Sequence, residues 1–170
     1  MAPEVRELDP AVQDELLGLL GLRAEELRVG WPLLEAYAGN WHPIVALADR
    51  GAFDRFTFDP AEVRKLMDRR GWTGTVAVVW SGPGSAAGSS QEPLVVEARN
   101  LFPVGTLSED PATGSAAAAL GGYLRETGLL PAAARLTVHQ GRHVGRPSVL
   151  SVEVPVAGGI RVSGSASSIG

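Results

Sequence analysis

A run without any polar side chain extends from Ala116 to Gly122 and continues into Tyr123 and Leu124. A helix that is apolar all round is normally buried on every side, whereas a membrane span needs about 20 apolar residues. The run therefore predicts a short helix of small residues buried in the middle of a soluble domain. Gly121 and Gly122 would each weaken a helix interior by about 1 kcal/mol relative to alanine, so they indicate either close backbone approach or an early helix end.

Two further helices are predicted by Asp-Pro pairs at residues 9–10 and 59–60. In each pair the aspartate is placed as the N-cap and the proline as the first helical residue. Apolar residues follow both pairs at helical spacing, and Gly21 and Gly71 are placed to end the two helices. The segment before the first pair, residues 1–8, has no strong pattern and is expected to be an irregular lead-in.

Runs rich in β-branched and other apolar residues predict the strands of a sheet. They lie at residues 41–49, 75–80, 93–102, 134–139, 148–154 and 159–163. The segment 81–91 is rich in glycine and serine and is expected to be a mobile surface loop. Many strands, few helices and one fully buried helix predict an α+β domain, in which a curved mixed β-sheet (a half-barrel) wraps around the central buried helix.

Composition narrows the possible functions. The length of 170 residues fits one domain, the formal net charge of −4 argues against nucleic-acid binding, and the chain has no cysteine. The lack of cysteine excludes disulfides, thiolate metal sites and a racemase that works with two thiols. His42, His139 and His143 have no metal-ligand spacing, so no metal is expected. Residues 1–28 are studded with charges and show no signal-peptide pattern, which predicts a cytoplasmic protein that does not contact membranes.

The candidate chemistry lies directly before the apolar run, in the loop from Glu109 to Ser115. Thr113 is placed to cap the helix, with Gly114 and Ser115 as its first two residues. Free backbone N–H groups at a helix N-terminus bind anions. The amides near Gly114, Ser115 and Ala116, together with the Thr113 and Ser115 hydroxyls, therefore predict a cradle for a carboxylate.

Asp110 would stand at the rim of such a cradle, where it could hydrogen-bond a substrate or take part in proton transfer. A simpler interpretation is that Asp110 and Thr113 only cap a buried helix, which is a common use of these residue types. No P-loop lysine follows Gly114. From the residues alone, both interpretations remain open.

The octapeptide Glu109-Asp110-Pro111-Ala112-Thr113-Gly114-Ser115-Ala116 resembles the signature loop of the phenazine-biosynthesis PhzF-like family. Residues 98–103 are similar to the R-x-F-P strand that leads into that loop, and residues 140–148 resemble the family's Q-G-x-x-x-G-R-P-S segment. Residues 14–22 and 39–48 are compatible with the helix and strand that begin the family's second domain. The resemblance thus covers nearly the whole chain.

The resemblance implies a fold like that of diaminopimelate epimerase, in which two similar domains each wrap a sheet around a central helix, with the active site between them. The best-known member isomerises a dihydro-hydroxyanthranilate without a cofactor, by acid–base proton transfer. By this resemblance Asp110 and Ser115 are catalytic, as the acidic site residue and the hydroxyl that holds the substrate. Thr113, Gly114, Ser115 and Ala116 form the anion cradle, and neither a cofactor nor a metal is implied.

One departure from the family pattern is large. The family's principal acid–base glutamate lies in its first domain, together with a Gly-His-Pro segment that bears a site histidine, whereas residues 1–170 resemble the C-terminal domain alone. His42 echoes that segment, but its position fits a second-domain strand, so we assign it no catalytic role. Glu109 is expected to cap the helix or face solvent, and Arg99 and Arg146 are expected to be structural.

The favoured hypothesis is that this chain is the C-terminal half of a PhzF-like, cofactor-independent isomerase that serves a biosynthetic process and acts on a small carboxylate. A separate N-terminal half, or a second copy of the chain in a dimer, would complete the active site and supply the catalytic glutamate. The alternative is a non-catalytic module that binds an anion or associates with itself. A gene product without function is the third hypothesis.

Overall fold

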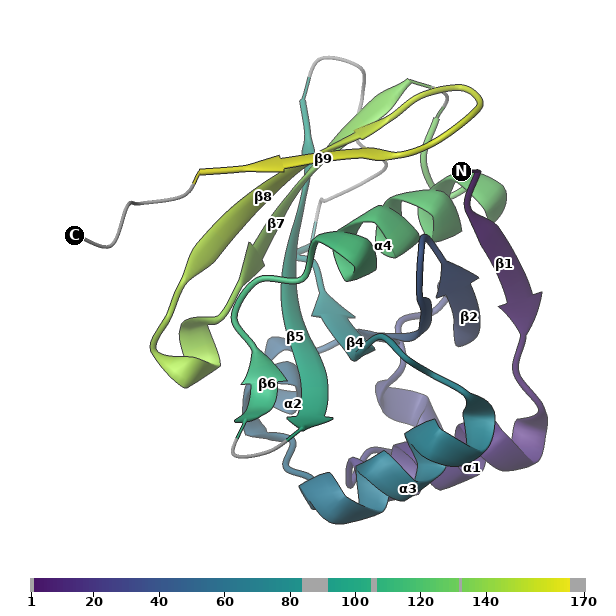
Figure 1. Cartoon of the computed structure of the whole chain (residues 1–170), viewed down its shortest axis with the longest axis vertical. Helices are drawn as coiled ribbons and strands as arrows, with labels where there is room; N and C mark the ends of the chain where they lie inside the picture. The colour runs from purple at the N-terminus through teal and green to yellow at the C-terminus, as the bar shows by residue number, and fades with distance from the viewer. Residues whose placement is uncertain (1, 84–91, 105–106, 132, 166–170) are drawn as a thin grey trace.

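The computed structural model describes residues 2–83, 92–104, 107–131 and 133–165, and Figure 1 shows how its elements are arranged. The strands form one sheet in the order β1-β2-β3-β4-β5-β7-β8-β9, and β6 pairs with β5 off this path. Most of the predicted glycine-rich loop, residues 84–91, lies outside the described residues. The strands are β1 (Glu4–Glu7), β2 (Leu34–Tyr37), β3 (Trp41–Leu47), β4 (Val76–Trp80), β5 (Leu94–Val104), β6 (Leu107–Asp110), β7 (Ala134–Gln140), β8 (Ser148–Val154) and β9 (Arg161–Gly164).

The helices are α1 (Pro10–Leu19), α2 (Arg50–Arg55), α3 (Pro60–Arg70) and α4 (Gly114–Glu126), with short 3-10 turns η1 (Ala24–Glu26) and η2 (Arg142–Val144). The Asp-Pro starts of α1 and α3 are confirmed, and Gly21 and Gly71 follow these two helices in the left-handed conformation, with φ of 62° and 67°. None of the helices in the described part of the chain has the length and apolar character of a membrane span.

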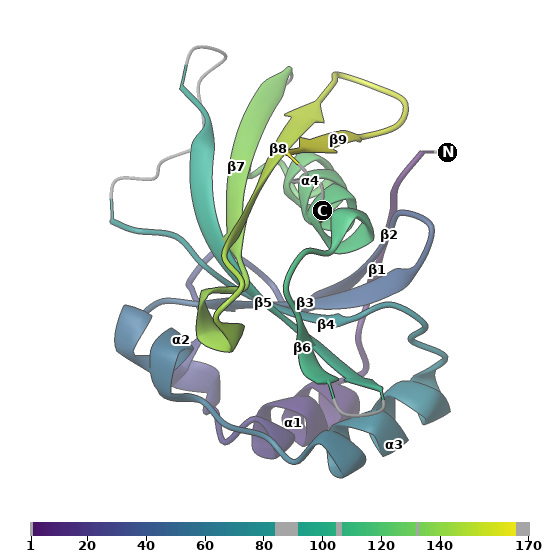
Figure 2. The ribbon, with the colours of Figure 1, turned by 60° about the vertical axis from the view of Figure 1, so that its left-hand side comes forward.

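The sheet curls around α4, which lies in its concave face (Figure 2). Helix α4 contacts β1, β2 and β3 on one side and β8 and β9 on the other. The sheet is mixed, because β3–β4 and β5–β7 are parallel pairs and the others are antiparallel. The predicted α+β half-barrel around a buried helix is therefore confirmed.

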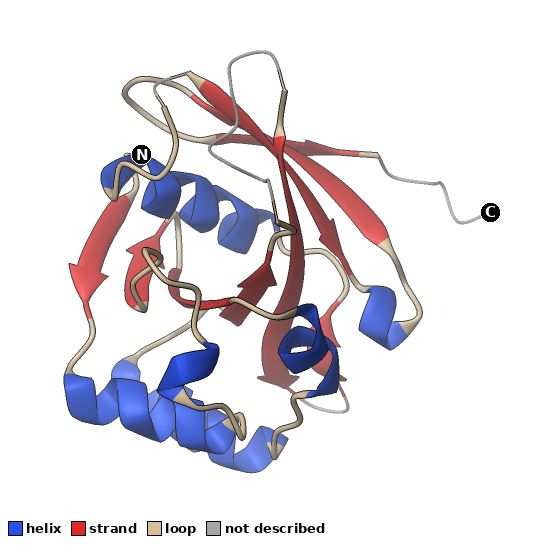
Figure 3. Cartoon of the chain, turned by 180° about the vertical axis from the view of Figure 1, so that it is seen from behind, coloured by secondary structure: helices blue, strands red, loops and turns tan. Residues whose placement is uncertain are grey.

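Two hydrophobic cores lie on the two faces of the sheet. The inner core joins α4 to the concave face, and Tyr123 and Leu124 of α4 are fully buried in it. The outer core joins the other face to α1, α2 and α3, which Figure 3 shows as a layer away from α4. Successive residues of a strand point to opposite faces of the sheet, so that Ile44 of β3 packs in the inner core and Val45 packs in the outer core. This explains the unbroken apolar run in the sequence of β3.

The two glycines of α4 allow neighbouring chain segments to approach closely. A Cβ atom on Gly121 would lie 3.1–3.2 Å from side-chain carbons of Val152, Val154 and Ile160. A Cβ on Gly122 would lie 2.4 Å from the Cβ of Pro3. Of the two explanations for these glycines, close approach is thus correct, and the helix continues beyond them to Glu126.

The prediction of an irregular lead-in over residues 1–8 is wrong, because β1 pairs antiparallel with β2 along its whole length. Only Val5 among its four residues packs on the inner core, so the segment shows no clear apolar alternation. The strand is held instead by main-chain pairing and by Arg6, which donates to the buried carboxylate of Glu35. Helix α2 was also missed, since it is short and begins within the polar segment after β3.

His42 on β3 is the fully buried histidine of the inner face, with 0% exposure. Its Nδ1 atom lies 3.0 Å from both the nitrogen and the carbonyl oxygen of Thr75. Its ring also packs under Gly74, where a Cβ atom would come within 2.3 Å of the ring. Burial lowers the pKa of His42 from 6.5 to about 4, and the Thr75 backbone offsets only part of this effect.

Replacing Gly122 with alanine is expected to destabilise the fold by about 1–3 kcal/mol. The new methyl group collides with Pro3 and strains the contact between α4 and the β1 segment. Gly18 in α1 is the matched control, because a methyl group added there would have no neighbouring atom within 4 Å. Gly18→Ala is expected to stabilise the protein by about 0.5–1 kcal/mol. Urea unfolding of both variants checks this, and equal effects of the two substitutions would contradict it.

The buried His42 makes stability depend on pH. Between pH 6.5 and 4 the unfolded histidine binds a proton that the folded one does not, so its contribution is present above pH 6.5 and is lost as the pH falls to about 4. The loss amounts to about 3 kcal/mol. The unfolding free energy should fall between pH 7 and pH 4 in both proteins. The fall should be about 3 kcal/mol smaller in His42→Gln than in the wild type. His139→Gln, at an exposed position, should keep the wild-type difference.

Candidate functional site

The loop from Asp110 to Ser115 connects the end of β6 to the start of α4. Thr113 occupies the N-cap position in an extended conformation, as expected, but its side chain does not cap the helix. The Thr113 hydroxyl instead donates to Oδ2 of Asp110 at 2.6 Å. Thr113 thus gives the first turn of α4 no side-chain cap. Within the described part of the chain, the first N–H groups of this helix are therefore available to an acceptor from outside.

The sheet topology brings Gln140 against this loop. Strands β6 and β7 pair with successive stretches of β5, so that Asp110 lies opposite Asn100 and Gln140 lies opposite Ala98. The Gln140 amide nitrogen donates to the carbonyl of Asp110 at 2.6 Å and to the Thr113 hydroxyl at 2.9 Å. Its amide oxygen accepts from the Thr113 N–H at 3.2 Å. With 2% exposure, Gln140 fixes the loop from the inside.

Two residues after β7 support the loop from behind. The Ser148 hydroxyl donates to the carbonyl of Pro111 at 2.7 Å. Gly141 has φ of 84°, and a Cβ atom there would lie 2.8 Å from the same carbonyl oxygen and 2.1 Å from that of Arg146. Sequence reasoning gave Gln140, Gly141 and Ser148 no role. The available signal was their place in the Q-G-x-x-x-G-R-P-S segment.

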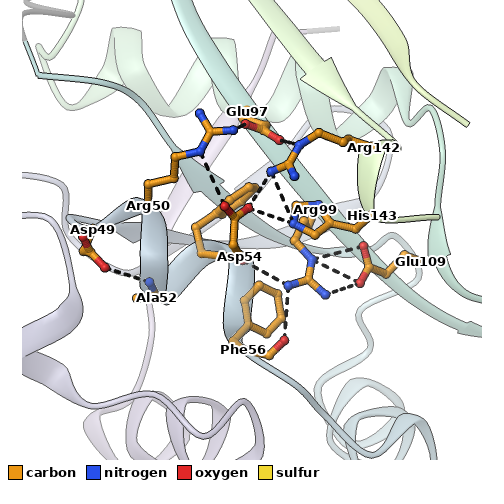
Figure 4. A network of polar contacts seen from close by, with 11 residues as sticks. Asp49, Arg50, Ala52, Asp54, Phe56, Glu97, Arg99, Glu109, Arg142 and His143 are labelled. Atoms are coloured by element: carbon orange, nitrogen blue, oxygen red, sulfur yellow. Dashed lines mark hydrogen bonds and ion pairs between the residues drawn. The ribbon is translucent and has the colours of Figure 1, made fainter. Parts of the chain in front are cut away.

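A buried ion pair anchors the start of the loop (Figure 4). Arg99 on β5 pairs with Glu109 on β6 through Nε at 3.1 Å and through Nη2, and both residues are 8% exposed. Arg99 also donates to the carbonyls of Phe53 and Phe56, so the buried charges are paired and hydrogen-bonded. The expectation that Glu109 caps the helix or faces solvent is wrong. Arg99 has the structural position that was expected.

Ser115 contacts the buried histidine. The hydroxyl oxygen of Ser115 lies 3.1 Å from Nε2 of His42. His42 is on β3, as predicted, and its side chain projects to the same face as Ile44 and Ala46, toward α4. The strand lies where its apolar run predicted it, whereas the contact between His42 and Ser115 was not predicted. Period-two alternation along β3 was the signal that could have found it.

The predicted site residues differ in their exposure to solvent. Asp110 and Ser115 are half-buried and Gly114 is exposed, whereas Thr113 and Ala116 are buried. Thr113 and Ala116 could therefore reach a ligand only through small exposed parts or main-chain groups. The arrangement can hold an anion at the helix start and can exchange a proton through the Asp110 carboxylate. The roles of all five residues stay predictions.

A second polar cluster contains possible metal ligands. Asp54, Glu97 and His143 bring one ligand atom each within 4.8 Å of one another. Arg142 donates to Glu97 at 2.6 Å and also to Asp54, and Arg50 lies 3.5 Å from Asp54 and 3.3 Å from Glu97 (Figure 4). Two guanidinium groups already neutralise these carboxylates and would repel a metal cation. The residues present therefore fit a closed charge network better than a metal site.

Two of the cavities in the described part of the molecule are compared with the loop. One of about 640 Å³ is lined by residues that include Arg28 and Trp31, and the guanidinium of Arg28 already donates to the carbonyl and hydroxyl oxygens of Ser81. The other, of about 470 Å³, is lined by residues that include Ser148, Arg50, Glu97 and Arg142. Neither of these two cavities is lined by the predicted site residues, so the candidate chemistry lies outside both.

Comparison with known proteins agrees with this architecture. A search of solved structures finds a phenazine biosynthesis protein of the PhzF family from Bacillus anthracis, with a TM-score of 0.69 and 17% identity, covering 95% of this chain and 54% of that chain. It also finds a predicted epimerase from Pseudomonas aeruginosa, with a TM-score of 0.67, 24% identity and the same two coverages. At these identities the likeness shows a shared fold.

Sequence comparison is more specific. An uncharacterized isomerase of Deinococcus radiodurans is 31% identical over 147 residues, which cover 85% of this chain and 44% of the relative. This chain thus spans about half the length of the relatives that it matches. The family model described as phenazine biosynthesis-like protein matches residues 3–169. On this match, which includes the whole loop and the segments that hold it, the chain belongs to the phenazine biosynthesis-like, or PhzF, family.

Proposed function

We propose that this chain forms one half of a cofactor-independent isomerase, in which the start of α4 binds the carboxylate of a small substrate and Asp110 transfers a proton. The observation that carries the proposal is the uncapped first turn of α4, flanked by two half-buried polar side chains, Asp110 and Ser115. Membership of the PhzF family and the isomerase name of the Deinococcus relative support the reaction type.

The helix start suits a carboxylate for two reasons. Its N–H groups point out of the helix, and the helix macrodipole adds partial positive charge there. The Ser115 hydroxyl lies beside them and can contribute another hydrogen bond. Gln140 donates two hydrogen bonds and accepts a third, and these hold Thr113 and the Asp110 carbonyl in place. A bound anion would therefore not have to order the loop.

The chemistry requires two proton-transfer groups. A base removes a proton from one carbon of the substrate, the double bond shifts, and an acid returns a proton to another carbon. Asp110 supplies one of these groups, and its Oδ2 atom already accepts a hydrogen bond from Thr113. The second group, a glutamate in our proposal, comes from another domain that faces α4. A separate N-terminal half or a second copy of this chain would provide that domain, since the relatives are about twice as long.

The alternative function is a module that binds an anion without turnover. It shares the carboxylate site with the isomerase and differs in having no proton transfer. Measurements of binding and of proton exchange therefore separate the two functions.

Ser115→Ala is expected to weaken the binding of benzoate about tenfold, because the site loses a hydrogen bond to a charged ligand. Isothermal titration calorimetry with benzoate, and with benzamide as the uncharged analogue, measures this. Ser151→Ala, at an exposed position of β8, is the control and should bind benzoate as the wild type does. Equal binding of benzoate and benzamide by the wild type would contradict an anion site.

Asp110→Asn is expected to abolish proton exchange. The assay follows deuterium incorporation from D₂O into a dihydro-hydroxyanthranilate by mass spectrometry. It combines this chain with the part of the Deinococcus relative that it does not match, and it runs this chain alone in parallel. We expect exchange in the wild-type mixture and a loss of at least about 100-fold in the variant. Benzoate binding without any exchange in the wild-type mixture would favour the binding module.

A further inference from the structure

His42 is a buried titratable side chain to which the proposed function gives no role. His42 contacts the Ser115 hydroxyl through Nε2, and the rest of its fully buried ring lies against Gly74 and Thr75. Because a Cβ atom at residue 74 would overlap the ring, the close fit of Gly74 leaves the imidazole little room to turn. The ring thus presents a fixed nitrogen to the residue that we expect to meet the ligand.

The opposite ring nitrogen faces three groups of a single residue. The Thr75 N–H points to Nδ1 at 3.0 Å, and the Thr75 carbonyl and hydroxyl oxygens lie at 3.0 and 3.1 Å. The Thr75 hydroxyl donates its own proton to Oδ1 of Asn100 at 2.6 Å. A main-chain N–H can only donate, whereas a carbonyl oxygen has two lone pairs and tolerates a missing partner better. With the Thr75 N–H donating to it, Nδ1 of the neutral ring is the acceptor, and the ring proton resides on Nε2. The Thr75 oxygens accept from Nδ1 when the ring is charged, and this is how the Thr75 backbone raises the pKa of His42.

This proton position determines what Ser115 can do. A hydroxyl has one proton to donate and two lone pairs to accept with. If Nε2–H of His42 donates to the Ser115 oxygen, the hydroxyl proton remains available for a ligand. In the other tautomer Ser115 would give its proton to His42 and present only lone pairs, which repel a carboxylate.

We infer that His42 is a positioning residue, which makes Ser115 a hydrogen-bond donor and so selects ligands that present an acceptor, such as a carboxylate, at the start of α4. The inference rests on the proposed function and adds to it the reason for the site's ligand preference. His42 does not touch the substrate and acts only through Ser115.

The arrangement holds over the physiological pH range. Burial lowers the pKa of His42 to about 4, so the ring is neutral at pH 6–8. The polar groups that face the ring are Thr75 of the β4 segment and Ser115 of α4, and both are uncharged. The selection therefore needs no charge on the histidine.

Nitrogen-15 NMR of the full chain tests the proton position directly. Long-range proton–nitrogen spectra at pH 7 show which ring nitrogen of a neutral histidine is protonated. The His42 signals are assigned by their absence in His42→Gln, and His139→Gln identifies a control histidine. We expect a protonated Nε2 and an unprotonated Nδ1 for His42. A protonated Nδ1 would overturn the inference.

Benzoate titration of two variants tests the consequence for binding. His42→Leu removes the donor and should weaken benzoate binding about tenfold. His42→Gln places an amide N–H₂ near the position of Nε2 and should restore most of the lost affinity, which a merely space-filling role would not explain. In the double variant His42→Leu/Ser115→Ala the two losses should not add, because they remove one chain of hydrogen bonds.

The outcomes separate this inference from the proposed function. Wild-type affinity for benzoate in His42→Leu, with Ser115→Ala still impaired, overturns the role of His42 alone. Equal binding of benzoate and benzamide by the wild type overturns the anion site and the selection together. If His42→Leu does not fold, the inference is tested by the nitrogen-15 spectra of the wild type and by the benzoate titration of His42→Gln. Loss of benzoate preference in a folded His42→Gln would overturn the inference.

Discussion

Burial of α4 against the concave face of the sheet is the constraint on which the other features depend. The helix is built from alanine and glycine because strands approach it from both sides, and Gly121 and Gly122 lie where β8, the segment before β9 and the β1 segment come closest. The helix reaches the surface at its two ends, at Gly114 and Ser115 in the first turn and at Arg125 and Glu126 in the last. Packing thus confines the polar side chains of an otherwise apolar helix to its two ends, and the candidate chemistry lies at the first of them.

Several polar side chains hold the loop and the first turn of α4 in place. The Arg99–Glu109 pair fixes the end of β6, Gln140 and Ser148 hold the main chain of the loop, and His42 contacts Ser115. Each of these side chains comes from a different strand. The sheet therefore holds this surface loop rigidly. A proton-transfer site needs such rigidity, because small displacements of its groups lower the reaction rate strongly.

The half-barrel and its central helix could be predicted from sequence because they depend on apolar periodicity, which is local. Strand β1 was missed because its main-chain pairing with β2 does not require an alternation of apolar residues. Helix α2 was missed because it is short and lies in a polar segment. For the site, the signature loop located Asp110 and Ser115. The roles of Gln140 and His42 arise from register, which places Gln140 opposite Ala98 and turns His42 toward α4. Such contacts between distant strands cannot be read from one sequence without knowing the strand order.

The central claim is that a carboxylate binds at the first turn of α4. Amide chemical shifts of the full chain, followed during titration with benzoate and separately with benzamide, test it most directly. We expect benzoate to shift the amide signals of Gly114, Ser115 and Ala116 most strongly, and benzamide to leave them nearly unchanged. The largest shifts at Arg28 and Trp31, or at Arg142 and Ser148, would place the ligand in one of the two cavities and contradict the claim.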